Sequence, residues 1–244
     1  MDPGNADLPI GMNSKEEATQ ESGVPKKIHE NGESEVGFGW HSRGYLPHFE
    51  GENLTQHVTF HLADSLPQHV LEKMNQQINA FPPEKQDLER RKRIEAWLDA
   101  GYGSCVLREP DVAVMVQRAL LHFDASRYRL MEWAIMPNHV HVLFEPEDGW
   151  KMSEVVASWK KFTARRIRDF IRAGIINPDI DSSHRIWHRE YRDRYIRNEL
   201  HFQNVVDYIR MNPVKAGFAA RPEEWPWSSA RIRCQESRSP DQQV

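Results

Sequence analysis

The chain has 244 residues, of which 39% are hydrophobic and 28% charged, and its formal net charge is −4. This length suits one folded domain with polar tails. The two cysteines form no CxxC pair, which argues against a disulfide scaffold or a thiolate zinc site and favours a reducing compartment. No apolar stretch approaches the ~18 residues of a membrane span, and the acidic N-terminus lacks the apolar core of a signal peptide. We therefore expect a cytoplasmic protein that does not associate with membranes.

Positive charge is concentrated in one part of this acidic chain. Residues 151–221 hold 15 Lys and Arg against 8 Asp and Glu, a net charge of +7. Residues 1–36 are acidic and poor in aromatic and β-branched side chains, which predicts a disordered tail. A basic segment within an acidic chain is typical of a local surface for a polyanion.

The first half of the folded sequence begins near residue 37. Residues 56–64 alternate apolar and polar side chains and predict a strand. Apolar spacings of three and four, together with prolines at the boundaries, predict helices over 67–81, 84–100 and 110–124. The second of these helices forms most of a helical insertion over 84–108.

The second half starts with two strands, 128–136 and 139–146, joined by a tight Pro-Asn turn. Further along the chain we predict a helix over 154–172 with Ser153 as its N-cap, an extended segment over 187–197, a helix over 199–212 that stops at Pro213, and a flexible tail over 231–244. This order of elements predicts an α+β domain over 37–230, with a ferredoxin-like antiparallel sheet covered by helices.

Two histidines share one face of the strand 139–146. Side chains alternate along a strand, so His139 and His141 point one way while the apolar residues between and after them point the other way. Two convergent imidazoles can bind one divalent metal ion. The structural alternative is a pair of half-buried histidines that satisfy backbone carbonyls, and this strand alone does not exclude it.

The helix 199–212 supplies a possible nucleophile and a possible third ligand. Tyr208 and Asn212 are one turn apart, beside the apolar stripe of the helix, and Asn198 suits the N-cap. A phenol can attack phosphorus when a divalent ion polarises the phosphate, and the Asn212 amide oxygen could help to hold that ion. Alternatively, Tyr208 is an ordinary amphipathic surface residue and Asn212 merely ends the helix before Pro213.

Cations and aromatic residues are interleaved in the basic segment. Cations suit phosphates and aromatic rings suit unstacked bases, which is the composition expected of a single-strand nucleic-acid surface. The candidate contacts are Lys160, Lys161, Arg165, Arg168, Trp187, His188, Arg189, Tyr191, Arg194 and Arg197. The alternatives are a solvated helix face and a core strand with paired arginines. Tyr191 and Tyr195 also remain rivals of Tyr208 as nucleophile.

Several motifs together resemble one family. MPNHVHVLFEP (136–146) resembles the His-hydrophobic-His motif of the single-tyrosine HUH transposases, which act on single-stranded DNA. WKKFTARRI, WHREY, YIRMNPVKAGF and WPWSSA follow in the order seen in the REP-associated tyrosine transposases. The resemblance covers about residues 38–230, and GWHSRGYLPHF and GYGSCVLREP resemble one subgroup of this family.

The resemblance implies a role for each site residue. His139, His141 and Asn212 match the metal-ligand positions, and Tyr208 matches the nucleophile. The implied fold is a ferredoxin-like or RRM-like sheet. The implied activity is a metal-dependent single-strand DNA endonuclease and strand transferase, which acts at DNA hairpins through a covalent 5′-phosphotyrosine. Phosphate chemistry and the amide ligand favour Mg²⁺ or Mn²⁺, while two imidazoles could also bind Zn²⁺. The REP-associated branch resembles monomers, which favours a monomer here, although related enzymes are homodimers.

Three departures from the family and two other functions stay open. The insertion, the acidic tail and the net negative charge depart from the pattern, and the charge leaves DNA affinity in question. A domesticated protein that binds DNA hairpins without cutting them is one alternative function. A histidine-motif nucleotide hydrolase is another, but its expected nucleophilic histidine is replaced by Leu143.

Overall fold

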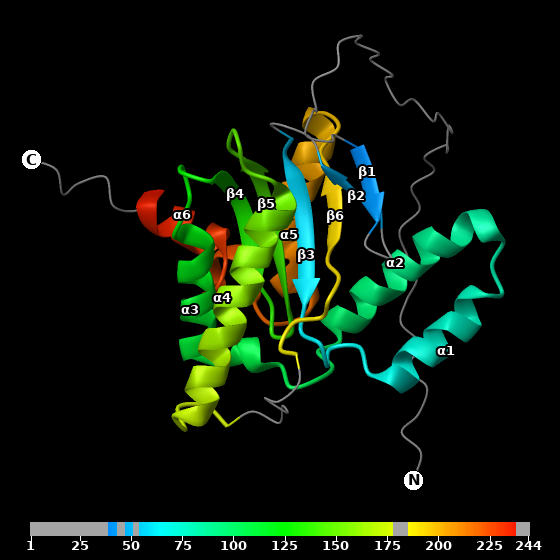
Figure 1. Cartoon of the computed structure of the whole chain (residues 1–244), viewed down its shortest axis with the longest axis horizontal. Coiled ribbons are helices and arrows are strands. Elements are labelled where there is room, and N and C mark those ends of the chain that lie inside the picture. Colours follow the sequence, from blue (N-terminus) through cyan, green and yellow to red (C-terminus); the bar gives the residue numbers. More distant parts are fainter. Residues whose placement is uncertain (1–38, 43–46, 51–53, 178–184, 238–244) are drawn as a thin grey trace, which may run out of the picture. The chain divides into compact units, whose positions relative to one another are not determined.

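The computed structural model describes residues 39–42, 47–50, 54–177 and 185–237 (Figure 1). The acidic tail predicted over 1–36 lies outside these residues, and so does most of the lead-in that follows it. Within the described ranges, no helix is both long enough and apolar enough to span a bilayer.

A four-stranded antiparallel sheet forms the centre of the domain, with strand order β4-β5-β3-β6 (Figure 1). Its strands are β3 (Gln56–His61), β4 (Tyr128–Ile135), β5 (His139–Pro146) and β6 (Arg192–Tyr195). With the helices between them, these strands follow the β-α-β-β-α-β order of a ferredoxin-like fold. The predicted α+β class and the β4–β5 hairpin are confirmed.

Helices α3 (Pro110–Leu121) and α4 (Met152–Arg172) cover one face of the sheet (Figure 1). Beneath them lies the main core, to which β5 contributes Val140, Val142 and Phe144. The Trp159 indole donates to the Tyr128 hydroxyl at 3.0 Å, and this hydroxyl donates to the Leu120 carbonyl at 2.7 Å. The polar atoms of these two large aromatic residues are thus paired although their rings are buried.

Helix α5 (Glu199–Lys215) packs on the other face, against β4 and β5. Val205, Val206 and Ile209 form a second cluster there with Ala134 and Leu143. Both faces of β5 are therefore buried. This explains why Leu143 lies on the same side of the strand as the histidines, although the main core is on the other side.

The ends of α5 agree with the sequence at one terminus and differ at the other. The Asn198 side chain accepts a hydrogen bond from the His201 N–H at 2.8 Å, so the predicted N-cap is confirmed. The helix does not stop at Pro213 but continues through it to Lys215. A proline removes only its own N–H from the helix, and the next turn closes through the Ala216 N–H to the Asn212 carbonyl at 3.0 Å.

Other boundaries also differ from the predictions. Helix α4 starts at Met152 with Lys151 as N-cap, so Ser153 lies inside the helix and is not its cap. The segment predicted as a flexible tail begins instead within α6 (Ser229–Ser237), which follows the short helix η2 (Pro222–Glu224). Helix α6 is held to the sheet because the Trp133 N–H donates to the Ser229 hydroxyl at 3.0 Å.

The segment predicted as a helical insertion, 84–108, contains α2 (Pro83–Asp99) and the short helix η1 (Val106–Arg108), and α1 (Gln68–Ile78) precedes it. In the loop after α2, Gly101 and Gly103 have φ angles of +73° and +88°. A side chain at Gly103 would lie 2.7 Å from the Asp64 carbonyl oxygen, so the close approach of the two backbones requires glycine here. Apart from the main sheet, β1 (Gly39–Ser42) and β2 (Pro47–Glu50) pair as a two-stranded antiparallel sheet.

Candidate active site

His139 and His141 lie side by side on β5, as predicted, and each is 1% exposed. Their Nε2 atoms are 3.0 Å apart. Both side chains point toward the face of the sheet that α5 covers, because they share a side of the strand with Leu143. The strand is central in the sheet, so its backbone is held by pairing on both sides.

The outer ring nitrogen of each histidine has its own partner. His139 Nδ1 lies 2.7 Å from Asn138 Oδ1. The Asn138 amide nitrogen donates to the Tyr102 carbonyl, which leaves Oδ1 as the acceptor for a proton on His139 Nδ1. With the proton on Nδ1, His139 Nε2 carries a lone pair that is directed into the site.

His141 is oriented by strand β3. Its Nδ1 lies 2.9 Å from the Thr59 hydroxyl and 3.3 Å from His57 Nε2, both of which can accept a proton. Thr59 is the register partner of His141 across the β3–β5 pair. This arrangement leaves Nε2 of His141 free to face Nε2 of His139, and hydrogen bonds of this kind orient and tune metal-binding imidazoles.

Both imidazoles are neutral near pH 7. Burial lowers the pKa of His139 to about 3, with a smaller contribution from nearby His61. Burial also holds the pKa of His141 well below its usual value, helped by His139 and His57. Because a metal ion binds the unprotonated nitrogen, these shifts keep the pair ready to act as ligands.

Tyr208 and Asn212 approach the histidine pair from α5. The Tyr208 ring meets the His141 ring edge to face, with 5.3 Å between ring centroids, and lies 5.7 Å from the His57 ring. One turn further on, Asn212 is 1% exposed. Within the described part of the chain, its Oδ1 is buried without a hydrogen-bond partner. The structure thus brings the four predicted site residues to one region.

The Tyr208 phenol is protonated in the resting site. Burial raises the pKa of Tyr208 above its ordinary value, and the carboxylates of Glu95 and Asp99 raise it further. The Arg192 guanidinium acts in the other sense and lowers the Tyr208 pKa, but by less. The Lys215 ammonium group lies 5.7 Å from the centre of the Tyr208 ring.

The atoms present suit a divalent ion. Two adjacent ligands of an octahedral ion, each about 2.1 Å from it, are about 3.0 Å apart, which is the spacing of the two Nε2 atoms. The partnerless oxygen of Asn212 would add an oxygen donor. Among the residues that the structure describes, no three His, Cys, Asp or Glu side chains lie close enough together to hold one ion.

Three supporting residues were missed from the sequence. His57 and Thr59 belong to the alternating segment QHVTFH, whose polar side faces the histidines of β5. Asn138 was predicted only as a turn residue. The available signal was the polar alternation of β3, but it points to a site only when the pairing with β5 is known. A fourth missed residue, Asp99, lies at the end of α2, where Oδ1 is 3.7 Å from His139 Nε2.

The predicted nucleic-acid contacts divide into exposed and structural residues. Lys161, Arg165, Arg189, Arg194 and Arg197 are exposed, whereas Arg168 and His188 are partly buried. Lys160 is also partly buried and donates to the carbonyls of His188 and Arg189 at 2.7 and 2.9 Å. It therefore ties α4 to the segment before β6.

The expectation that Trp187 and Tyr191 form an exposed stacking surface is corrected. Trp187 is 4% exposed, and its indole donates to the Thr163 hydroxyl at 2.9 Å. Tyr191 is 6% exposed and belongs to the core cluster under α3 and α4. The alternating aromatic pattern here fills the core, because these rings pack beneath α4. Tyr195 lies on the edge strand β6, opposite Gln56 of β3.

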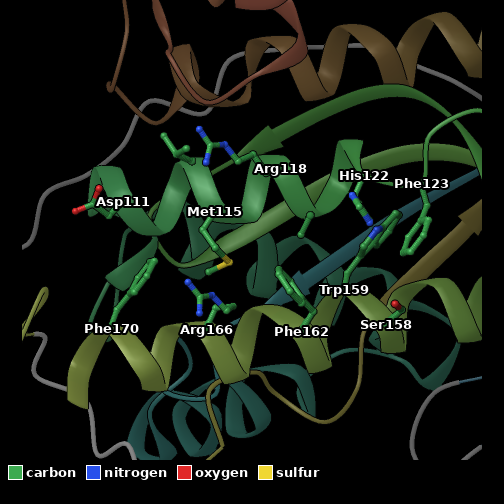
Figure 2. A pocket seen from close by; sticks show the side chains of 12 residues that line it. Asp111, Met115, Arg118, His122, Phe123, Ser158, Trp159, Phe162, Arg166 and Phe170 are labelled. Carbon is green, nitrogen blue, oxygen red and sulfur yellow. The ribbon is translucent and has the colours of Figure 1, made fainter. Parts of the chain in front are cut away.

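A separate cavity of about 620 Å³ lies between α3 and α4 (Figure 2). Met115 of α3 and Phe162 and Arg166 of α4 point into the space between the two helices (Figure 2). These helices cover the sheet face opposite to α5. The cavity is therefore across the sheet from the histidine pair and is not part of the candidate active site.

Comparison with known proteins relates part of this domain to a transposase family. Residues 116–212 match the model of the family described as "Transposase IS200 like". This stretch contains both histidines and Tyr208 and ends at Asn212.

Two curated relatives are both described as REP-associated tyrosine transposases. A REP-associated tyrosine transposase of Escherichia coli K12 is 26% identical over 117 residues, which are 47% of this chain and 62% of the relative. A protein of Haemophilus influenzae, named provisionally as the same kind of transposase, is 31% identical over 96 residues, 39% of this chain and 54% of the relative. The match therefore spans less than two thirds of either protein. The predicted resemblance to the REP-associated tyrosine transposases is confirmed.

A solved structure was also compared. It is described as a REP-associated tyrosine transposase bound to a REP hairpin, and it is 16% identical with a TM-score of 0.48 over 81% of this chain and 88% of that one.

Proposed function

We propose that this protein is a transposase that cuts and rejoins single-stranded DNA beside a hairpin through a covalent bond between Tyr208 and a 5′ phosphate. The observation that carries the proposal is the packing of Tyr208 against His141, whose Nε2 faces that of His139. A phenol beside two neutral imidazoles with converging lone pairs is suited to metal-assisted attack on phosphorus. The match of residues 116–212 to the IS200-like family supports it.

His139, His141 and Asn212 are the residues that would hold a divalent ion, for which we propose Mg²⁺ or Mn²⁺. When bound, such an ion withdraws charge from a phosphate oxygen and stabilises the transition state. The tautomers inferred for the two histidines depend on Asn138 and Thr59, which keep the proton on Nδ1 of each ring.

Tyr208 is the residue that reacts with DNA. Its hydroxyl oxygen attacks phosphorus and forms a tyrosyl–phosphate bond to the 5′ phosphate of one DNA segment. At the same time, the bond from phosphorus to the 3′ oxygen of the other segment breaks. The phenolic proton passes to solvent, and the released 3′ oxygen takes up a proton. In the reverse direction, the 3′ hydroxyl of the same or another strand attacks the phosphotyrosine and restores the phenol. The bond energy is kept, so no nucleotide cofactor is required.

The chain places positive charge near the reacting group. Lys215 lies over the Tyr208 ring and favours the developing phenolate. Arg194 is the register partner of His57 on the edge strand, which puts it on the same side of the sheet as Tyr208. Exposed cations at this edge, including Arg197, suit the phosphates of a single strand that enters the site.

The test uses DNA hairpins with short single-stranded flanks, chosen from the genomic DNA on either side of the gene, together with Mn²⁺. We expect an adduct that resists denaturation in detergent and that mass spectrometry locates at Tyr208. Tyr208→Phe should abolish it, while Tyr195→Phe, the matched control, should keep it. An adduct that persists in Tyr208→Phe would overturn the proposal. Hairpin binding without metal-dependent cleavage would instead indicate a protein that only binds DNA.

A further inference from the structure

Asp99 is the last residue of α2 and reaches the histidine pair from the helical insertion. Its Oδ1 lies 3.7 Å from His139 Nε2. Within the described residues, this oxygen is buried without a hydrogen-bond partner, although the side chain as a whole is 32% exposed. One oxygen of the carboxylate therefore faces the site.

The atom that Asp99 faces is an acceptor. The proton of His139 is on Nδ1, because Asn138 Oδ1 accepts it and the Asn138 amide nitrogen is committed to the Tyr102 carbonyl. His139 Nε2 therefore has no proton to give to Asp99. A buried carboxylate oxygen opposite a lone pair is unfavourable unless a cation lies between them.

The position of Asp99 is built into the fold. The loop that follows it contains Gly101, Gly103 and Cys105, all with left-handed backbone angles. This tight loop brings the Tyr102 carbonyl to the Asn138 side chain at 2.9 Å, and the Ser104 N–H donates to Asp64 at 2.7 Å. The loop thus joins the end of α2 to the turn that carries His139.

We propose that Asp99 is a further ligand of the metal ion held by His139, His141 and Asn212. This inference rests on the proposed function. Two adjacent ligands of an octahedral ion are about 3.0 Å apart, so Asp99 Oδ1, now at 3.7 Å from His139 Nε2, needs only a small side-chain rotation to join the set.

Asp99 would change the chemistry of the site. The two imidazoles and the amide of Asn212 are neutral, so Asp99 supplies the only negative charge of the set. A carboxylate is a hard oxygen donor and shifts preference toward Mg²⁺ and Mn²⁺. It also makes metal binding depend on α2, the helix that ends at Asp99.

The inference is tested by Mn²⁺ binding to the full chain without DNA, followed through the loss of the free Mn²⁺ signal in electron paramagnetic resonance. We expect Asp99→Asn to weaken Mn²⁺ binding by at least the ~10-fold typical of disturbed metal sites, and Asp99→Ala by at least as much. Crystals soaked in Mn²⁺ should show an Asp99 oxygen about 2.2 Å from the ion. Unfolding in urea without metal should show that both variants fold.

Glu95→Gln is the matched control. Glu95 lies one turn earlier on α2, also raises the pKa of Tyr208, and pairs with Arg192 at 3.2 Å. It should leave Mn²⁺ affinity within a few-fold. Equal weakening in Glu95→Gln and Asp99→Asn would show a general charge effect and overturn ligation.

The outcomes also separate this inference from the proposed function. Unchanged affinity in Asp99→Asn, with loss in His141→Ala, would overturn the role of Asp99 and leave the proposed metal site standing. Mn²⁺ that does not bind the unaltered chain would overturn the metal site itself, and the role of Asp99 with it.

Discussion

Tyr208 lies edge-on to His141, with ring centroids 5.3 Å apart and an angle of 83° between the rings. The two residues come from α5 and β5, which meet through a small apolar cluster that includes Leu143 and Ile209. The cluster lies directly beside the site, since Leu143 follows His141 by two residues on the same side of the strand. The geometry of nucleophile and histidine is therefore set by packing between a helix and a strand.

The Thr59 hydroxyl orients His141, so its removal should weaken metal binding. Thr59→Val keeps the shape of the side chain but removes the oxygen that lies 2.9 Å from His141 Nδ1. We expect a ~10- to 100-fold loss of Mn²⁺ affinity, as for other residues that support metal-binding histidines. Calorimetric titration with Mn²⁺ measures it. Thr55→Val is the control, because the Thr55 hydroxyl donates to Glu145 instead; an equal loss in both variants would contradict the prediction.

The Glu132 side chain, on β4, links α5 and α6 to the sheet through hydrogen bonds and ion pairs. It is 1% exposed, accepts from Arg210 of α5 at 2.6 Å and from the Ser229 hydroxyl at 2.5 Å, and also pairs with Arg233. Glu132→Gln removes the charge between two arginines and should lower the free energy of unfolding by about 2–3 kcal/mol, less than the roughly 3–5 kcal/mol of a fully buried pair because both arginines are partly exposed. Urea unfolding measures this.

The control for Glu132 is Glu145→Gln. Glu145 pairs with Arg129 at 3.1 Å, and the Arg129 side chain is 63% exposed, so this change should cost less than ~1 kcal/mol. Similar losses in both variants would show that Glu132 does not hold the two helices in the way described.

Buried histidines should make the metal-free protein sensitive to acid. Burial lowers the pKa of His57, His61 and His139 to about 3, against ~6.5 in an unfolded chain. Between these values the unfolded state binds more protons, so stability is complete above pH ~6.5 and falls as pH drops toward 3. Each such histidine adds about 1.4 kcal/mol per pH unit to the slope well below pH 6.5.

His61→Gln tests this assignment. His61 contacts Ser65 at 2.7 Å and stacks on His188, and it lies outside the proposed ligand set. Between pH 6 and 5, the slope of the unfolding free energy against pH should be smaller in this variant by about 1.4 kcal/mol per pH unit, the contribution of one proton. Above pH 7.5, neither protein should show much slope. A slope that does not change would mean that His61 is protonated in the folded state.

Substitutions of Lys160 and of its neighbour Lys161 should affect different properties of the protein. Lys160 donates to the carbonyls of His188 and Arg189, so Lys160→Met leaves two carbonyls without this partner and should cost about 1–3 kcal/mol of stability. Lys161 is exposed on α4. Lys161→Met should leave stability unchanged and, if α4 contacts phosphates, lower the salt dependence of hairpin binding by about one unit. Fluorescence anisotropy at several salt concentrations decides whether α4 takes part.

The features that depend on local periodicity could be predicted from the amino-acid sequence. Alternation along β5 put His139 and His141 on one side, and a spacing of four put Tyr208 and Asn212 on one helical face. Asn198 was recognised as a cap because capping is decided within one turn. The order of elements was enough for the α+β class, since few topologies bury these faces.

Which distant residues complete the site depends on how the strands, helices and loops pack together. Thr59 meets His141 because β3 pairs with β5 in one register, and Asp99 meets His139 because a glycine-containing loop folds back on the β4–β5 turn. Trp187 was misread for the same reason, since an aromatic residue among cations suits a DNA surface and a buried core equally well. Local pattern sets the side on which a residue points, but burial and distance are set by contacts between segments far apart in the chain.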